Sequence, residues 1–337
     1  MSEKCMVKAL YIMNREPFEF VYPTDVRKEI ETLADITQPQ LTMEEVRNNM
    51  SVLKDVEVVF SGWGGPRLDQ EFLEAAPNLK ALFYAAGSIK GTVTEESWNR
   101  NIVVTSAVVA NSIPVAEYTL SQVLFSLKGG WQFVREIRNK KEFPHKPFAH
   151  IPGGFRSTVG LISLSSVGRM VNDHLKNFDL HVLAYDPFVS EEEAEALGVE
   201  LCSLDEIFKR SDIVSLHAPL LDETIGMITG DHFAMMKPHS SFINTARGAI
   251  VRENEMVEVL EKRSDITAIL DVTDPEPPLA NSLLYTLPNV VITPHVAGSE
   301  GRECGRMGEY MLEEFKRYLK GQDLKWQVRR EELKNRA

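Results

Sequence analysis

The chain has 337 residues, a length typical of two domains, and its 43% hydrophobic and 26% charged residues are usual for a globular protein. A formal net charge of −12 argues against nucleic acid or an anionic membrane surface as the main partner. The cysteines, Cys5, Cys202 and Cys304, show neither metal-ligand spacing nor a disulfide framework, and no apolar run approaches the roughly 18 residues of a membrane span. We therefore expect a cytoplasmic protein without a metal site and without a membrane or nucleic-acid partner.

Short apolar runs rich in β-branched residues recur along the chain. They predict strands at 7–13, 56–60, 81–84, 102–105, 159–164, 181–185, 212–217, 241–244, 267–271 and 290–293. Amphipathic stretches between them predict helices at 25–34, 42–54, 69–76, 94–100, 114–138, 167–178, 190–197, 203–210, 253–263 and 300–320. Alternation of strands and helices over the whole length favours parallel sheets that helices cover on both faces.

The longest helical pattern, 114–138, opens at Pro114, a residue suited to a first helical turn. We place a domain change near its start and expect the final helix to return to the first domain. The predicted fold class is α/β, with two doubly wound parallel-sheet domains and a cleft between them, where ligands of such folds bind. The predicted domains are residues 1–110 with 297–337, for the substrate, and residues 111–296, for a nucleotide.

A predicted strand runs into a helix at 158–171, where the sequence partly matches the dinucleotide fingerprint G-x-G-x-x-G. Ser163, Ser165 and Gly168 occupy the fingerprint positions, so only the third glycine is present. Pyrophosphate binding uses backbone N–H groups and a helix N-terminus, and a serine hydroxyl can also donate to phosphate. Asp186, 18 residues after Gly168, suits hydrogen bonds to an adenosine ribose and disfavours the 2′-phosphate of NADP. The alternatives are an ordinary strand–helix turn and, for Asp186, a plain turn residue before Pro187.

Three residues with complementary chemistry follow predicted strands in the second half of the chain: Arg247, Glu276 and His295. In a parallel sheet the ends of these strands share one edge, so the three side chains can converge. A guanidinium binds a carboxylate in bidentate fashion, an imidazole exchanges a proton near neutral pH, and a carboxylate beside it stabilises the imidazolium. The set suits interconversion of a 2-hydroxy acid and a 2-oxo acid, with nicotinamide moving the hydride. Taken singly, each residue also fits a structural or solvent-exposed position.

Four segments, 211–220, 243–251, 270–277 and 289–298, resemble the D-isomer-specific 2-hydroxyacid dehydrogenase family in order and spacing. The resemblance covers nearly the whole chain. It implies a flavodoxin-like substrate domain built from both termini, a central Rossmann NAD-binding domain, and a homodimer formed through the NAD domain. The catalytic residues would be Arg247, Glu276 and His295.

The fingerprint and the resemblance together predict NAD as cofactor, with NADH preferred over NADPH. The predicted cofactor contacts are Ser165, Ser166, Val167, Gly168, Asp186, His217, Ala218, Pro219, Thr245, Ala246, Asp271, His295 and Gly298. By resemblance, Asp271 would contact the nicotinamide carboxamide. The predicted substrate contacts are Ala86, Gly87, Ser88, Arg247 and His295, the turn at 86–88 offering its backbone N–H groups to the substrate carboxylate.

Two departures from the family pattern bear on function. Serines stand where the family normally has the first two fingerprint glycines, and Gly87 is followed by Ser88, Ile89 and Lys90 where the family usually has an aspartate. The predicted substrate is a small 2-hydroxy acid such as glycerate, glyoxylate or a related sugar acid. A formate dehydrogenase fits less well, because that family pairs its histidine with glutamine. A third alternative is a catalytically weak dinucleotide-sensing or partner-binding protein, as in the C-terminal-binding-protein corepressors; the serines favour it, whereas the intact triad disfavours it.

Overall fold

The computed structural model describes residues 6–145 and 150–331, so Cys5 lies outside the described residues. The chain divides into two compact units. We call the residues up to Ser112 together with those from Ser299 the terminal unit, and Ile113–Gly298 the central unit. The prediction of two parallel-sheet α/β domains is confirmed. The substrate and nucleotide roles of the units stay predictions.

In its described residues, the terminal unit has a five-stranded sheet whose strand pairs are all parallel. Its strands are β1 (Val7–Ile12), β2 (Ala34–Ile36), β3 (Val58–Ser61), β4 (Ala81–Tyr84) and β5 (Val103–Ser106). Their order, β2-β1-β3-β4-β5, is the flavodoxin-like one. The helices are α1 (Arg15–Val21), α2 (Thr24–Glu31), α3 (Met43–Asn48), α4 (Gln70–Ala75), α5 (Glu95–Asn99) and α13 (Cys304–Leu319), with 3-10 turns at Met50–Leu53 and Gly301–Glu303.

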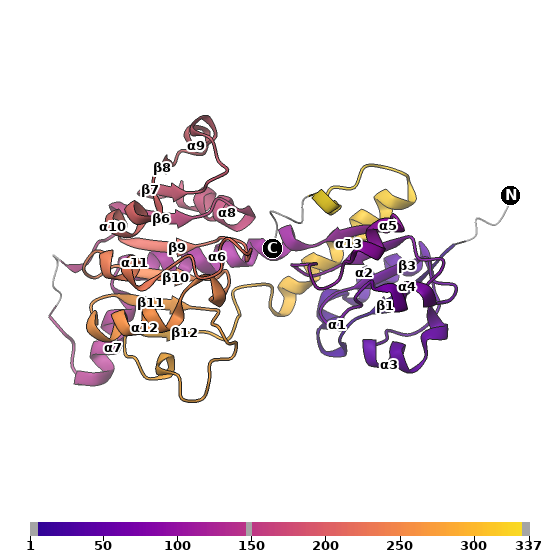
Figure 1. The fold of residues 1–337 in the computed structure, drawn as a ribbon, viewed down its shortest axis with the longest axis horizontal. Helices are drawn as coiled ribbons and strands as arrows, with labels where there is room; N and C mark the ends of the chain where they lie inside the picture. Colours follow the sequence, from indigo (N-terminus) through magenta and orange to yellow (C-terminus); the bar gives the residue numbers. More distant parts are fainter. Residues whose placement is uncertain (1–5, 146–149, 332–337) are drawn as a thin grey trace. The chain divides into compact units, whose positions relative to one another are not determined.

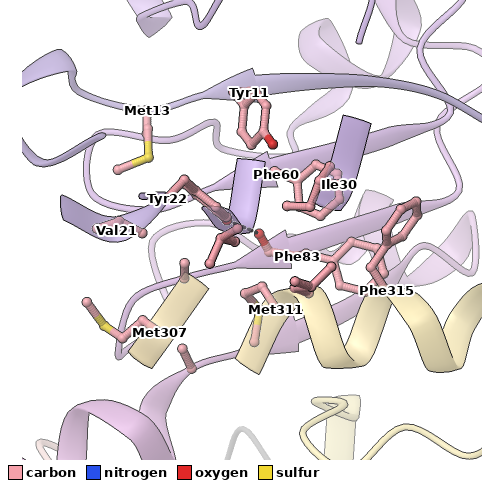
Figure 2. Close-up of a cluster of buried hydrophobic side chains, with 14 of the residues drawn as sticks. Tyr11, Met13, Val21, Tyr22, Ile30, Phe60, Phe83, Met307, Met311 and Phe315 are labelled. Carbon is pink, nitrogen blue, oxygen red and sulfur yellow. Dashed lines mark hydrogen bonds between the residues drawn. The ribbon is translucent and has the colours of Figure 1, made fainter. Parts of the chain in front are cut away.

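The C-terminal helix α13, yellow in Figure 1, packs beside the indigo N-terminal elements. The strand register places Tyr11, Phe60 and Phe83 side by side on one face of the sheet, with adjacent ring centroids 5.4 and 5.5 Å apart. Phe315 of α13 meets this row edge-on, 5.0 Å from the Phe60 centroid (Figure 2). Burying this much aromatic surface explains why the last described helix belongs to the N-terminal sheet.

In its described residues, the central unit has a seven-stranded sheet in the order β12-β11-β10-β9-β6-β7-β8, again with parallel pairs. The strands are β6 (Phe155–Ile162), β7 (Asp179–Tyr185), β8 (Glu200–Leu201), β9 (Ile213–Leu216), β10 (Ser241–Asn244), β11 (Thr267–Leu270) and β12 (Val290–Ile292). The helices are α7 (Gly130–Lys140), α8 (Ser166–Leu175), α9 (Glu191–Leu197), α10 (Leu204–Arg210), α11 (Gly230–Met235) and α12 (Glu253–Lys262), with 3-10 turns at Gly248–Ile250 and Leu283–Tyr285. Numbered from β6, this is the Rossmann order with one further strand.

The prediction of one long helix at 114–138 is wrong in two respects. α6 (Val108–Leu127) begins earlier, just after Ser106, whose hydroxyl accepts the Val108 N–H at 3.2 Å. Pro114 therefore lies inside the helix and not in its first turn. The pattern also breaks at Gly129, whose φ of +64° separates α6 from α7. The division between the two units falls within α6.

Among the strands and α-helices of the described residues, four short ones were not predicted: α1, β2, β8 and α11. Each has eight residues or fewer, too few for a period to emerge from the apolar pattern. β2 begins at Ala34, the last residue of the stretch predicted as a helix at 25–34, and pairs with β1 just beyond that stretch. Within the described ranges, no helix is both long enough and apolar enough to cross a membrane.

Candidate active site

The three predicted catalytic residues follow neighbouring strands of the central unit. β10, β11 and β12 are adjacent in the sheet, and Arg247, Glu276 and His295 lie in the loops that leave their carboxyl ends. Parallel pairing puts these ends on one edge of the sheet. The structure therefore brings the three loops together.

His295 and Glu276 form a direct pair. The imidazole Nδ1 lies 2.6 Å from Glu276 Oε1, and the two side chains are 45% and 43% exposed. An ionised carboxylate only accepts hydrogen bonds, so Nδ1 carries the proton and Nε2 is left for chemistry. His295 has a φ of +57°, held by hydrogen bonds from its N–H to the carbonyl oxygens of Asp271 and Thr293 at 2.9 and 3.0 Å. Such left-handed backbone is uncommon outside glycine and often marks a functional position.

Arg247 lies half-buried next to this pair. Burial lowers the pKa of its guanidinium, and the nearby Glu276 charge acts in the opposite direction. Nη1 donates to the Ala246 carbonyl oxygen at 2.6 Å, and within the described residues the guanidinium forms no salt bridge. A partly desolvated cation is stabilised by an anion, and a guanidinium matches a carboxylate well. Arg247 is therefore suited to bind an acidic ligand.

The loop that carries Glu276 is held against the loop that carries Arg247. Gly248 packs so closely on Thr273 that an added Cβ would lie 2.0 Å from the Thr273 carbonyl carbon. The Asp274 N–H donates to Glu253 at the start of α12 at 3.2 Å. Burial raises the pKa of Glu253. Gly248 and Glu253 were not singled out from sequence; in the structure both hold the loops that carry Arg247 and Glu276.

A second network fixes the loop after β12. The buried carboxylate of Asp271 accepts hydrogen bonds from Thr293 Oγ1 at 2.6 Å and from the N–H groups of Val296 and Ala297 at 2.9 Å each. Tyr118 of α6 lies 2.9 Å from Thr293 Oγ1. Thr293 and Tyr118 extend the hydrogen-bond network of Asp271, and sequence reasoning missed both. Thr293 has the same signal as His295, since it also follows a strand.

The nucleotide segment forms the turn between β6 and α8. Ser165 is the N-cap of α8, and its hydroxyl accepts the Gly168 N–H at 3.5 Å. An added Cβ at Gly168 would lie 2.1 Å from the Ser163 carbonyl oxygen, so glycine is needed for the close approach of helix and turn. Ser166 and Val167 lie in the first turn of α8. The helix N-terminus thus has the form of a phosphate-binding turn.

The two serines have protein partners. Ser163 Oγ donates to Asp186 Oδ2 at 3.2 Å, and Ser165 Oγ donates to the His217 carbonyl oxygen at 2.7 Å. Ser163 has a φ of +76°, a conformation that glycine adopts without strain. Both hydroxyls, which the sequence suggested as phosphate donors, therefore connect the turn to the ends of β7 and β9.

The other predicted cofactor residues lie along the same edge of the central sheet. His217, Ala218 and Pro219 follow β9, Thr245 and Ala246 follow β10, Asp271 follows β11, and Gly298 follows His295 beyond β12. Burial lowers the pKa of His217 to about 3, and neither ring nitrogen has a hydrogen-bond partner in the described structure. The turn between β6 and α8, the Asp186 carboxylate at the end of β7 and the buried His217 imidazole fit a dinucleotide. Contact of each residue with NAD stays a prediction.

The predicted substrate turn Ala86-Gly87-Ser88 lies in the terminal unit, just beyond β4. Ser106 Oγ, at the end of β5, contacts the carbonyl oxygens of Ala86 and Gly87 at 3.2 and 2.7 Å and so fixes the turn. The nearest atom to an added Cβ at Gly87 would be 3.6 Å away, so internal packing does not require glycine there. Its role toward a substrate stays a prediction.

Comparison with known proteins gives one family. The model of the D-isomer specific 2-hydroxyacid dehydrogenase NAD-binding domain matches residues 120–297. A D-3-phosphoglycerate dehydrogenase of Methanocaldococcus jannaschii is 32% identical over 87% of this chain and 54% of its own length. An (S)-sulfolactate dehydrogenase of Chromohalobacter salexigens is 31% identical over 75% of this chain and 82% of its own length.

The chain spans about half the length of the phosphoglycerate dehydrogenases that it matches. Among solved structures, the NAD-complexed D-isomer specific 2-hydroxyacid dehydrogenase of Lactobacillus delbrueckii ssp. bulgaricus superposes with a TM-score of 0.79. It is 25% identical and covers 96% of this chain and all of its own. This chain therefore belongs to the D-isomer specific 2-hydroxyacid dehydrogenase family.

Proposed function

We propose that this chain is an NAD-dependent oxidoreductase that interconverts a small 2-hydroxy acid and its 2-oxo acid. The observation that carries the proposal is the 2.6 Å contact between His295 Nδ1 and Glu276, next to a half-buried Arg247 whose guanidinium forms no salt bridge with any described residue. A histidine oriented by a carboxylate and an arginine that lacks an anion are the two groups that oxidation of a hydroxy acid needs.

Each residue has one task in this proposal. Arg247 binds the substrate carboxylate. His295 takes the hydroxyl proton on Nε2 as the C–H bond breaks, and in the reverse direction it returns that proton to the carbonyl oxygen. Glu276 accepts the hydrogen bond from Nδ1, which fixes the tautomer and stabilises the imidazolium that forms. The bound cofactor accepts or supplies the hydride.

The proposed cofactor is NAD, with NADH bound more tightly than NADPH. Asp186 supports this preference, because a carboxylate at the end of β7 accepts hydrogen bonds from ribose and repels a 2′-phosphate. Two relatives are named for acids with a second anionic group, phosphoglycerate and sulfolactate. We therefore include 2-oxo acids that carry a second anionic group among the candidate substrates.

The test is NADH oxidation with a panel of 2-oxo acids, half of them with a second anionic group. We expect turnover on at least one member of the panel. NADH binding without turnover on any member would contradict the enzyme and favour a dinucleotide-sensing protein. Absence of NADH binding would contradict the cofactor as well.

A homodimer is the proposed assembly. α7 has an apolar face, yet within the described chain none of its residues is buried. Next to it, Phe125 of α6 is 41% exposed and packs edge-on against Trp131. A second copy of the chain would cover this apolar surface. Sedimentation velocity would show a dimer that Phe125→Glu weakens, whereas a monomeric wild-type protein would contradict the assembly.

A further inference from the structure

Ser163 holds an unusual position in the turn between β6 and α8. It has left-handed backbone at a φ of +76°, where a side chain is disfavoured and glycine is not. Its N–H donates to the Tyr185 carbonyl oxygen at 2.7 Å, and its Oγ donates to the neighbouring Asp186 Oδ2 at 3.2 Å. The residue is thus connected twice to the end of β7, and its hydroxyl has a specific partner.

The hydrogen bonds of Asp186 can be counted atom by atom. Oδ2 accepts from Ser163 Oγ and from the Leu164 N–H at 2.8 Å, whereas Oδ1 accepts from the Phe188 N–H at 2.9 Å. Each carboxylate oxygen has two acceptor positions. Oδ2 is therefore filled, and within the described residues the one position that remains belongs to Oδ1 of this half-buried side chain.

We propose that Ser163 is a positioning residue for Asp186 and that this pair sets the preference for a dinucleotide without a 2′-phosphate. The inference rests on the proposed NAD site. With Oδ2 held by the turn, Oδ1 is the acceptor that remains for a ribose hydroxyl, which has a proton to donate. A 2′-phosphate is an anion, and a carboxylate that cannot rotate away repels it.

Ser165 supplies a matched control in the same turn. Its hydroxyl donates to the His217 carbonyl oxygen, at the end of β9, and does not contact Asp186. Loss of that hydroxyl disturbs the cap of α8, where either dinucleotide would place its pyrophosphate. Ser165→Ala therefore weakens the binding of NADH and NADPH alike, whereas Ser163→Ala changes the ratio of their dissociation constants.

The experiment measures the dissociation constants of NADH and NADPH by calorimetry for the wild-type protein, Ser163→Ala, Ser163→Gly, Asp186→Ala and Ser165→Ala. We expect the ratio of the NADPH constant to the NADH constant to fall about tenfold in both Ser163 variants, the scale of one hydrogen bond to a charged group. Ser163→Gly also removes the backbone strain, so a fall in that variant reflects the lost hydroxyl and not misfolding. In Ser165→Ala the ratio stays within about twofold of the wild-type value, since both constants rise together.

Asp186→Ala is expected to lower the ratio of the NADPH constant to the NADH constant at least as much as the Ser163 variants do. Adding Ser163→Ala to Asp186→Ala should not change this ratio further, because the hydroxyl acts through the carboxylate. An unchanged ratio in both Ser163 variants would overturn the inference while leaving the NAD site intact. A further fall in the double variant would also overturn it. Wild-type protein that binds neither nucleotide would instead overturn the proposed function.

Discussion

Gly248 lies against the backbone of Thr273, so closely that an added Cβ would be 2.0 Å from the Thr273 carbonyl carbon and 2.2 Å from its oxygen. The contact joins the loop that follows β10, with Arg247, to the loop that follows β11, with Glu276. The relative placement of two proposed catalytic residues thus depends on a glycine between them that has no chemical part in the reaction.

Gly248→Ala is expected to destabilise the protein by about 1–3 kcal/mol, because the methyl group must displace backbone and not a flexible side chain. Chemical denaturation would measure this loss. The matched control is Gly91→Ala, where no described atom beyond the adjacent residues lies within 4 Å of the added methyl group. Equal stability of the two variants would contradict the close packing of the loops.

Glu276→Gln preserves the shape of the side chain but removes its charge. Glutamine can still accept from His295 Nδ1, yet it no longer stabilises the imidazolium. We expect kcat to fall by about ten- to a hundredfold, with less change in the affinity for NADH. Stopped-flow kinetics and calorimetry would separate the two quantities. If kcat stays unchanged, Glu276 has no part in proton transfer.

Thr293→Val tests the network behind the His295 loop. The substitution removes one donor from the buried carboxylate of Asp271, and the two backbone N–H groups remain. A cost of about 1–3 kcal/mol in unfolding free energy is expected for a buried acceptor that loses a partner. Thr286→Val is the control, since that hydroxyl bonds a carbonyl oxygen at the surface. A neutral Thr293→Val would contradict the positioning role.

His217 predicts a pH dependence of stability. Burial lowers its pKa in the folded protein to about 3, whereas the unfolded residue titrates at its ordinary value near 6.5. Between these values the unfolded chain binds the extra proton. The contribution of neutral His217 to the free energy of unfolding is therefore complete above pH about 6.5, and it is lost as the pH falls toward 3.

We expect the free energy of unfolding to decline less steeply between pH 7 and pH 4, roughly, in His217→Leu than in the wild-type protein. Comparing the two proteins cancels the contribution of other histidines with lowered pKa, such as His232. Denaturation curves at a series of pH values would measure the difference. Parallel pH profiles would show that His217 is not buried as a neutral group.

The sheets and the strand-end residues could be predicted from sequence because their signals are local. A buried parallel strand is an unbroken apolar run, and the polar residue after it lies at a sheet edge whatever the details of packing. β10, at Ser241–Asn244, has the predicted bounds. The start of α6 at Val108 was not predicted, since the prediction took Pro114 as a first-turn residue and the helix has it in its interior.

The contacts that position the site are tertiary, and the sequence did not indicate which residues would meet. Ser163 was expected to interrupt the glycine fingerprint or to donate to phosphate, whereas its hydrogen bond to Asp186 depends on a left-handed φ and on pairing of β6 with β7. Thr293 and Tyr118 are 175 residues apart in sequence and meet in the folded unit. Residue type and spacing therefore indicated the chemistry, whereas the fold determines how the reacting groups are held.

The most direct test of the account is the turnover of His295→Ala with the best 2-oxo acid of the panel, measured beside its NADH affinity. The variant removes the proposed acid–base group and leaves the nucleotide turn untouched. We predict a fall in kcat by roughly two to four orders of magnitude with a much smaller loss of NADH affinity, because the other predicted cofactor contacts remain. Unchanged turnover with a folded, NADH-binding variant would contradict a reaction centre built on His295, Glu276 and Arg247.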